Sequence, residues 1–262
     1  MKEAVSWLPL EALAEAEAMM KSEADTHLSK QIGENVMSRA NLFFDSSMNS
    51  KIIVSLTGVG LVGFVIFHML GNLQVFEGSD AINGYASILR DMPIFLWTAR
   101  AGLLVAAGFH IGLAIRLALR NRQGRPVAYA VREYRAASIS SRTMALTGSL
   151  LLLFIVFHLL HLTAGVIDPS APDGIDEQGR MDVYGKIIHA FSNPIYVGIY
   201  VIGQLALGLH LSHAVSSALQ TWGIEHAALN HLFRLTGPVV ALLVVLGNLS
   251  IIFAVFLGLV GA

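Results

Sequence analysis

The 262-residue chain contains no cysteine and few charged residues. The absence of cysteine excludes disulfides, thiolate metal ligands and cysteine-held iron–sulfur clusters within this chain. Charged residues make up 13% of it, against about 25% in soluble globular proteins. With 55% hydrophobic residues and a mean hydropathy of +0.64, most of the chain must be solvated by lipid or by protein. The net charge of −1 argues against a nucleic-acid-binding protein.

Long runs with almost no charge predict five membrane spans, at roughly residues 52–76, 93–119, 143–167, 191–219 and 235–260. Each run reaches the ~20 residues that a helix needs to cross a bilayer. Lipid offers no hydrogen bonds to the backbone, so apolar runs that lack strand-like alternation must be helices. We therefore expect an all-α integral membrane bundle of five transmembrane helices over residues 51–262, after a cytoplasmic N-terminal arm over residues 1–50.

The charges of the loops predict the orientation of the bundle. The connection 116–142 carries seven arginines and one acid, whereas the connection 168–186 carries five acids and two basic residues. By the positive-inside rule the arginine-rich connection is cytoplasmic. The N-terminus is then cytoplasmic and the C-terminus lies outside.

An internal repeat relates the two halves of the bundle. Residues 55–70, SLTGVGLVGFVIFHML, recur as ALTGSLLLLFIVFHLL at residues 145–160. A weaker echo links AAGFHIGLAIRLAL at 106–119 with ALGLHLSHAVSSAL at 206–219. Matched spans run in the same direction, so the chain is predicted to contain two copies of one hairpin, related by an axis along the membrane normal.

The repeat aligns four intramembrane histidines, His68 with His158 and His110 with His210. Each imidazole lies roughly 25 Å along its helix from the membrane entry point. His68 and His158 therefore share a level near the outer face, and His110 and His210 share one near the inner face, with roughly 15–20 Å between the levels. Ionisable residues inside a membrane are costly and usually functional.

Two imidazoles from different helices are the axial ligands of a low-spin haem. No Asp or Glu lies inside the histidine-bearing spans, which argues against a bare zinc or iron site with more protein ligands. We therefore predict an outer haem b on His68 and His158, and an inner haem b on His110 and His210. For any one of these histidines taken alone, a helix–helix hydrogen bond is the alternative.

With these motifs the chain resembles the dihaem cytochrome b membrane anchor of succinate:quinone oxidoreductases and fumarate reductases, of the five-helix, single-anchor type. The resemblance covers roughly residues 42–260. The matching stretches are Thr57-Gly58, His68-Met69 with Gly71 to Gln74, Phe109-His110 to Arg116, Ser140 to Met144, Thr147-Gly148 to His158-Leu159, and Leu209-His210 to Trp222-Gly223.

The resemblance implies a subunit of succinate dehydrogenase, respiratory complex II of the tricarboxylic acid cycle, in a bacterial inner membrane. Such an anchor serves electron transport between an iron–sulfur subunit and membrane quinone, commonly menaquinone. The iron–sulfur subunit and a flavoprotein with covalent FAD bind at the cytoplasmic face, so no catalytic residue and no dicarboxylate chemistry are expected in this chain. Some dihaem fumarate reductases carry an acid two residues before the fourth-span ligand, where this chain has Gly208. Because this chain lacks that acid, we favour succinate oxidation over fumarate reduction as the direction of turnover.

Three arginines are weaker candidates for contact with haem propionates. Arg100 lies within the second span, where it either pairs with a propionate of the outer haem or extends to the interface. Arg116 and Arg142 either meet propionates of the inner haem or anchor helix ends.

Four polar residues near the ligands are further candidates. His161 and His213 each follow a ligand by three residues, and they either hydrogen bond a propionate or quinone or join two helices. Asn72 and Gln74, at the outer end of the first span, are candidate contacts for quinone or propionate. His189 is expected to be an ordinary solvated residue.

Two other functions stay open at this point. Another bis-histidine cytochrome b anchor, of the nitrate reductase or formate dehydrogenase type, would use the same ligands with different partners. A proton-coupled transporter could use intramembrane histidines as proton relays, without haem.

Overall fold

The computed structural model describes residues 18–28, 30–31, 46–124, 138–170, 174–224 and 229–261. By internal contacts the chain divides into two units, residues 1–50 and 51–262. Residues 18–28 and 30–31 of the first unit are helical. Most of the predicted arm, and residues 125–137 of the arginine-rich connection, lie outside the described residues.

Within the described residues, five helices are long and apolar enough to cross a membrane. They are α2 (Ser47–Asn72) with the 3-10 turn η1 (Leu73–Glu77), α4 (Pro93–Gln123), α6 (Met144–His158) with the π-helical turn η2 (Leu159–Thr163), α8 (Pro194–Thr221) and α9 (Asn230–Phe256). The described part of the chain contains no β-strand, only one isolated bridge between Ile175 and Met181. The protein is therefore an all-α, multi-pass membrane protein, as its hydropathy predicts.

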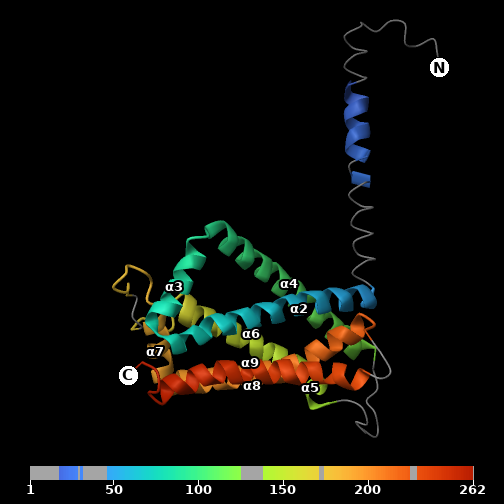
Figure 1. The fold of residues 1–262 in the computed structure, drawn as a ribbon. Helices are drawn as coiled ribbons and strands as arrows, with labels where there is room; N and C mark the ends of the chain where they lie inside the picture. The colour runs from blue at the N-terminus through green and yellow to red at the C-terminus, as the bar shows by residue number, and fades with distance from the viewer. Residues whose placement is uncertain are drawn as a thin grey trace, which may run out of the picture. The chain divides into compact units, whose positions relative to one another are not determined.

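Three shorter helices mark the two ends of the bundle (Figure 1). α3 (Ser79–Arg90) and α7 (Val183–Ser192) lie at one end, which we call the α3–α7 end. α5 (Ile139–Arg142) lies at the opposite end, the α5 end. The long helices α2 and α6 run toward the α3–α7 end, and α4 and α8 run away from it, so matched spans of the repeat are parallel.

Capping residues explain where the observed spans depart from the predicted ones. The fourth span begins at Pro194, because the Asn193 side chain accepts a hydrogen bond from the backbone N–H of Ile195 at 2.9 Å and proline suits the first helical position. Phe191 belongs instead to α7. The third span ends at Thr163, just before Gly165, whose φ of +65° suits glycine and stops the helix.

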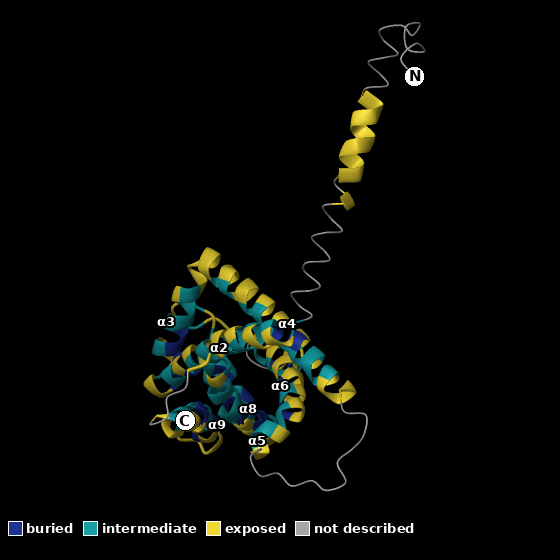
Figure 2. Cartoon of the chain, turned by 90° about the vertical axis from the view of Figure 1, so that its right-hand side faces the viewer, coloured by how far each residue is buried: buried dark blue, intermediate teal, exposed yellow. Residues whose placement is uncertain are grey.

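The described helices differ greatly in how much of their surface is buried (Figure 2). In α8 and α9, 33% of the most apolar window is buried, against 6% in α4. Met69 of α2, Leu211 of α8 and Val244 of α9 form one buried cluster. The many exposed leucines, isoleucines and phenylalanines of the long helices are side chains that a hydrocarbon environment accepts without cost.

A polar network joins two connections at the α3–α7 end. Asn83 of α3 is 1% exposed, and its amide donates to Asp176 and Asp182 at 3.2 Å each, while its carbonyl accepts the backbone N–H of Tyr184 at 3.0 Å. Arg180 forms ion pairs with Asp176 at 2.8 Å and with Asp80 at 2.7 Å. The connection before α7 is thereby held against α3.

Candidate functional site

The four predicted ligands meet in two pairs. The ring centroids of His68 and His158 lie 5.9 Å apart, and those of His110 and His210 lie 6.4 Å apart. Within the pairs the ring planes are inclined at 84° and 67°. Two imidazoles on opposite sides of one metal, each bonded at about 2.0 Å, have ring centres about 6 Å apart. The separations in both pairs match that arrangement.

The surroundings of His110 leave one ring nitrogen available to a metal. Its Nδ1 lies 3.0 Å from the carbonyl oxygen of Val54 and 3.4 Å from Oγ1 of Thr57. A carbonyl only accepts, so Nδ1 carries the proton and Nε2 keeps its lone pair. A Cβ at Gly58 would lie 3.0 Å from Cε1 of His110. The imidazole therefore lies directly against the backbone of α2.

His210 has the same environment in the second half of the repeat. Its Nδ1 lies 3.3 Å from Oγ1 of Thr147. That hydroxyl donates its own proton to the backbone, with the Thr143 carbonyl 3.0 Å away, so it accepts from Nδ1 of His210. A Cβ at Gly148 would lie 3.4 Å from Cε1 of His210. Threonine followed by glycine thus holds the facing imidazole in both halves.

His158 is held by a tyrosine rather than a threonine. Its Nδ1 lies 3.2 Å from the hydroxyl of Tyr200 on α8, and Nδ1 of His161 lies at the same distance from that hydroxyl. Tyr200 and His161 are 4% and 3% exposed. The π-helical turn η2 follows His158 directly and carries His161 onto the tyrosine.

His68 has a different partner. The Asn72 amide donates to Nε2 of His68 at 3.3 Å, and the ring of Phe64 stacks on the imidazole with a centroid distance of 5.4 Å. The proton of His68 is then on Nδ1, and Nε2 holds the lone pair. A metal bound at His68 would take the place of the hydrogen bond from Asn72.

Helix geometry gives the distance between the two levels. Thr57, which contacts His110, precedes His68 by eleven residues on α2, and Thr147, which contacts His210, precedes His158 by eleven residues on α6. Eleven residues of α-helix rise about 16 Å. The two imidazole pairs are therefore separated by about that distance along the bundle.

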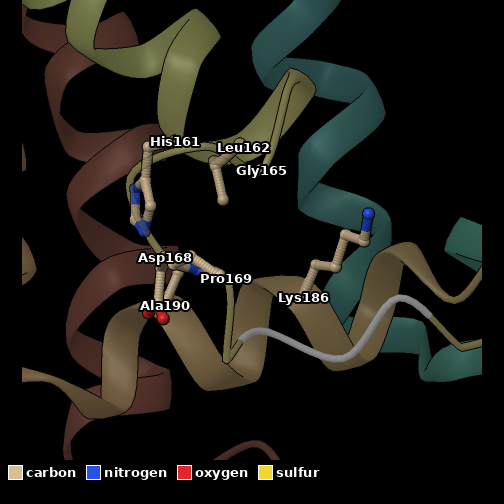
Figure 3. Close-up of a pocket in the computed structure, with 7 residues that line it drawn as sticks. All are labelled: His161, Leu162, Gly165, Asp168, Pro169, Lys186 and Ala190. Carbon is tan, nitrogen blue, oxygen red and sulfur yellow. The ribbon is translucent and has the colours of Figure 1, made fainter.

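A pocket opens beside His161 at the α3–α7 end (Figure 3). Lys186 lies across it from His161 and Asp168, and Leu162, Gly165, Pro169 and Ala190 complete the lining. Positive, negative and imidazole groups thus line one pocket near the His68–His158 pair.

Both carboxylate oxygens of Asp168 have hydrogen-bond partners. The Ser170 hydroxyl donates to one carboxylate oxygen, and Nε2 of His189 lies 3.1 Å from the other. The hydrogen bond from Ser170, with a further contribution from His189, holds the pKa of Asp168 below its usual range. The side chain of His189, expected to be an ordinary solvated residue, is 37% exposed, and its imidazole also joins α7 to the connection after η2.

Arg100 and two other weaker candidates have no described contact with an imidazole pair. The Arg100 guanidinium lies over the Trp97 ring, 5.0 Å from its centroid, and forms a cation–π contact on the exposed side of α4. His213 is half-buried one turn after His210, and Gln74 is half-buried in η1. Their predicted contacts with propionate or quinone stay predictions.

Arg116 and Arg142 lie toward the α5 end of the bundle. Arg116 is half-buried in the second half of α4, and Arg142 is the exposed last residue of α5. Both therefore belong to the half of the bundle that holds the His110–His210 pair, where the sequence predicts their contact with propionates.

The donor set of each pair fits a haem. Among the described residues no three His, Asp or Glu side chains come together as a metal site, so each pair offers two imidazoles alone. A porphyrin supplies the other four ligands of six-coordinate iron, which makes two axial imidazoles a complete set. Hydrogen bonding at Nδ1 is the usual way in which a metal-binding histidine is oriented.

Sequence reasoning did not single out the groups that orient the imidazoles. Thr57 and Thr147 recur in the repeat directly before the glycines, and that recurrence is the signal that could have identified them. Tyr200 has no such signal, because its counterpart in the first half of the repeat is Arg100.

No protein-family model matches the chain, and neither a curated protein nor a solved structure matches it. The motifs of the sequence and the geometry of the two imidazole pairs are therefore what indicates a function.

Proposed function

We propose that the protein is the membrane anchor and electron-transfer subunit of a succinate dehydrogenase, with two b haems between an iron–sulfur subunit and membrane quinone. The observation that supports this most strongly is the arrangement of four imidazoles in two pairs at two levels. At His110 and His210 the proton is held on Nδ1, which leaves Nε2 for iron. The partners and the substrate class come from the resemblance of the motifs.

The side chains of the protein hold and orient the two cofactors. His68 and His158 would hold one haem, and His110 and His210 the other. Bound haem supplies reversible one-electron redox chemistry. Gly58 and Gly148 let the inner imidazoles approach the helix backbone. The two levels, about 16 Å apart, would carry electrons stepwise across the bilayer.

The orientation follows from the charges of the connections. The arginine-rich connection 116–142 places the α5 end in the cytoplasm under the positive-inside rule. The His110–His210 haem is then the inner one, facing the iron–sulfur subunit, and the flavoprotein with FAD binds beyond that subunit. In a bacterial inner membrane the N-terminus is cytoplasmic and the C-terminus lies outside.

His161, in the wall of the pocket, is the candidate contact for a quinone headgroup at the α3–α7 end, with menaquinone the expected quinone. Lys186 and His161 offer hydrogen-bond donors to quinone oxygens, and Asp168 offers an acceptor for quinol hydroxyls. The pocket also lies next to the ligand His158, through Tyr200.

Haem content of the purified chain and its histidine variants tests the proposal. We expect two b haems per wild-type chain in a dithionite-reduced minus oxidised spectrum. His68→Ala and His158→Ala should deplete the same haem, and His110→Ala and His210→Ala the other. The matched control is His231→Ala, which removes an exposed imidazole near the start of α9 and should keep both haems. A colourless wild-type protein, expressed with ample haem supply, would refute the proposal.

Co-purification tests the partners separately. From its native membrane the tagged chain should bring down a flavoprotein with covalent FAD and an iron–sulfur protein, together with succinate:quinone reductase activity. Recovery of a molybdenum subunit would instead indicate an anchor of the nitrate reductase or formate dehydrogenase type, with the same haem ligands.

A histidine relay for protons is the second candidate, because Tyr200 links His158 to His161 and the pocket. The contacts that orient His110 and His210 are a backbone carbonyl and threonine hydroxyls, and these do not extend toward the pocket. A relay predicts proton flux in vesicles of the haem-free protein, whereas the haem proposal predicts none.

A further inference from the structure

The two halves of the repeat are alike at one level and different at the other. At the level of His110 and His210, a threonine hydroxyl lies against Nδ1 in each half. At the other level, Arg100 in the first half corresponds to Tyr200 in the second, and Gly71 corresponds to His161. The surroundings of the His68–His158 pair therefore differ between the two copies of the repeat.

Arg100 and Tyr200 differ in what they contact. The guanidinium of Arg100 lies on Trp97, at the surface of α4. Tyr200 is buried, and its ring packs on Phe154, Phe157 and Phe191 at centroid distances of 5.2, 5.8 and 5.0 Å. The phenyl rings fix the tyrosine ring, and with it the position of the hydroxyl between two imidazoles.

Close helix packing brings the Tyr200 hydroxyl to His158. A Cβ at Gly203 would collide with the ring of Phe154, so α8 approaches α6 closely just after Tyr200. The π-helical turn η2 then brings His161 to the same hydroxyl. π-Helical turns are rare and are often found at functional sites.

The hydrogens of this trio can be assigned by counting. A phenol has one proton and accepts through its lone pairs, whereas each neutral imidazole has one proton. If Nε2 of His158 is unprotonated for a metal, its Nδ1 carries the proton and donates to Tyr200. The Tyr200 hydroxyl then donates to Nδ1 of His161, and the proton of His161 is on Nε2. In this order each of the two contacts of the Tyr200 hydroxyl joins one donor to one acceptor.

We infer that Tyr200 is the positioning residue of the His68–His158 level: its hydroxyl holds His158 with Nε2 toward His68 and connects that ligand to His161 in the wall of the pocket. This inference rests on the proposed function, because it assigns Tyr200 a role toward the haem on that pair. Thr57 and Thr147 have the corresponding role at the other level.

The hydrogen bond also tunes the ligand. An acceptor at Nδ1–H raises the basicity of a metal-bound imidazole. A more basic imidazole stabilises ferric over ferrous iron, so the acceptor lowers the midpoint potential of that haem. Removing the hydroxyl should therefore raise the potential of the haem on His68 and His158 and leave the haem on His110 and His210 unchanged.

Redox titration of the intact complex with Tyr200→Phe is the decisive experiment. Phenylalanine keeps the ring packing and removes the hydroxyl alone. Both haems should be present, and only the haem assigned to His68 and His158 should move to a higher potential. His161→Phe should shift the same haem by less, because the hydroxyl still accepts from His158. The matched control is Tyr196→Phe, whose ring packs on His161 at 4.2 Å and which should move neither potential.

Each outcome has one meaning. Selective loss of the His68–His158 haem in Tyr200→Phe also supports the inference, since the other haem shows that the bundle is folded. Two unchanged potentials, or equal shifts of both, would overturn the inference and leave the proposed function standing. A wild-type complex without haem would overturn the proposed function itself.

Discussion

At the scale of single residues, the orienting partners of the imidazoles are the most informative feature of the protein. His110 has two acceptors at Nδ1, the carbonyl of Val54 and the hydroxyl of Thr57. Among the described residues His210 has one, the hydroxyl of Thr147. Loss of one acceptor therefore leaves His110 with a second acceptor, whereas His210 keeps none among the described residues.

This inequality predicts different effects of the same substitution in the two halves. Thr147→Val leaves Nδ1 of His210 without its acceptor, and we expect haem affinity at that pair to fall about 10–100-fold, the usual cost of losing an orienting partner. Thr57→Val leaves the Val54 carbonyl on His110 and should lower affinity less than about 3-fold. Haem transfer to a scavenging apoprotein measures both, and equal losses would contradict the assignment.

The carboxylate of Asp168 predicts a pH-dependent contact. Because its folded pKa lies below the unfolded value of about 3.9, its contribution to stability is complete above that value and is lost as pH falls through the folded pKa. Acidification below pH ~4 should lower the protection factor against hydrogen exchange of the Ser170 amide, which donates to Asp168 at 3.3 Å. In Asp168→Ala, which removes the acceptor, that protection factor should already be low at neutral pH and lose this acid-dependent step.

At the scale of secondary structure elements, the contact of α8 with α9 shows how a membrane helix tolerates proline. Pro238 lies inside α9 and cannot donate to the carbonyl of Arg234 one turn earlier. The Ser216 hydroxyl of α8 donates to that carbonyl at 3.1 Å and accepts the N–H of Gly237 at 3.2 Å. A Cβ at Gly237 would collide with the Ser212 carbonyl, so glycine is required for this approach.

A double-mutant cycle isolates this interaction. Ser216→Ala should destabilise the bundle by about 1 kcal/mol, because lipid offers no replacement donor to the Arg234 carbonyl. In a Pro238→Ala background the helix supplies its own N–H to that carbonyl, and the cost of Ser216→Ala should fall by roughly half. Unfolding equilibria in mixed micelles measure the coupling, and additive effects of the two substitutions would contradict it.

At the scale of the whole molecule, the network around Asn83 connects the two halves of the bundle at the α3–α7 end. α3 follows the span that carries His68, and the connection before α7 follows the span that carries His158. Asn83 and Arg180 join α3 to that connection, so they help to keep the two spans at a fixed separation.

Under the proposed function, loss of Asn83 should therefore affect the haem on His68 and His158 more than the haem on His110 and His210. Asn83→Ala removes the partner of the Tyr184 N–H and two hydrogen bonds to carboxylates, at an expected cost of about 1–3 kcal/mol. Under mild denaturant the haem on His68 and His158 should dissociate before the haem on His110 and His210. Spectra taken along the denaturant series test the order, and simultaneous loss of both haems would contradict the expected role of the network.

The sequence by itself determined the features that depend on composition and spacing. Lipid forces long apolar runs into helices whatever their neighbours, so five spans are predictable from hydropathy alone. The repeat and the rise per residue predict the partners His68 with His158 and His110 with His210, because both are properties of one chain read along its length.

Only the tertiary structure decided which groups touch the imidazoles. Tyr200 meets His158, His189 meets Asp168 and Arg100 lies on Trp97 because of the rotation of each helix about its axis and its register against its neighbours. Rotation and register arise from packing between distant segments, such as Gly203 against Phe154. The sequence pattern of one helix does not specify its rotation or its register, because both depend on packing against the neighbouring helix.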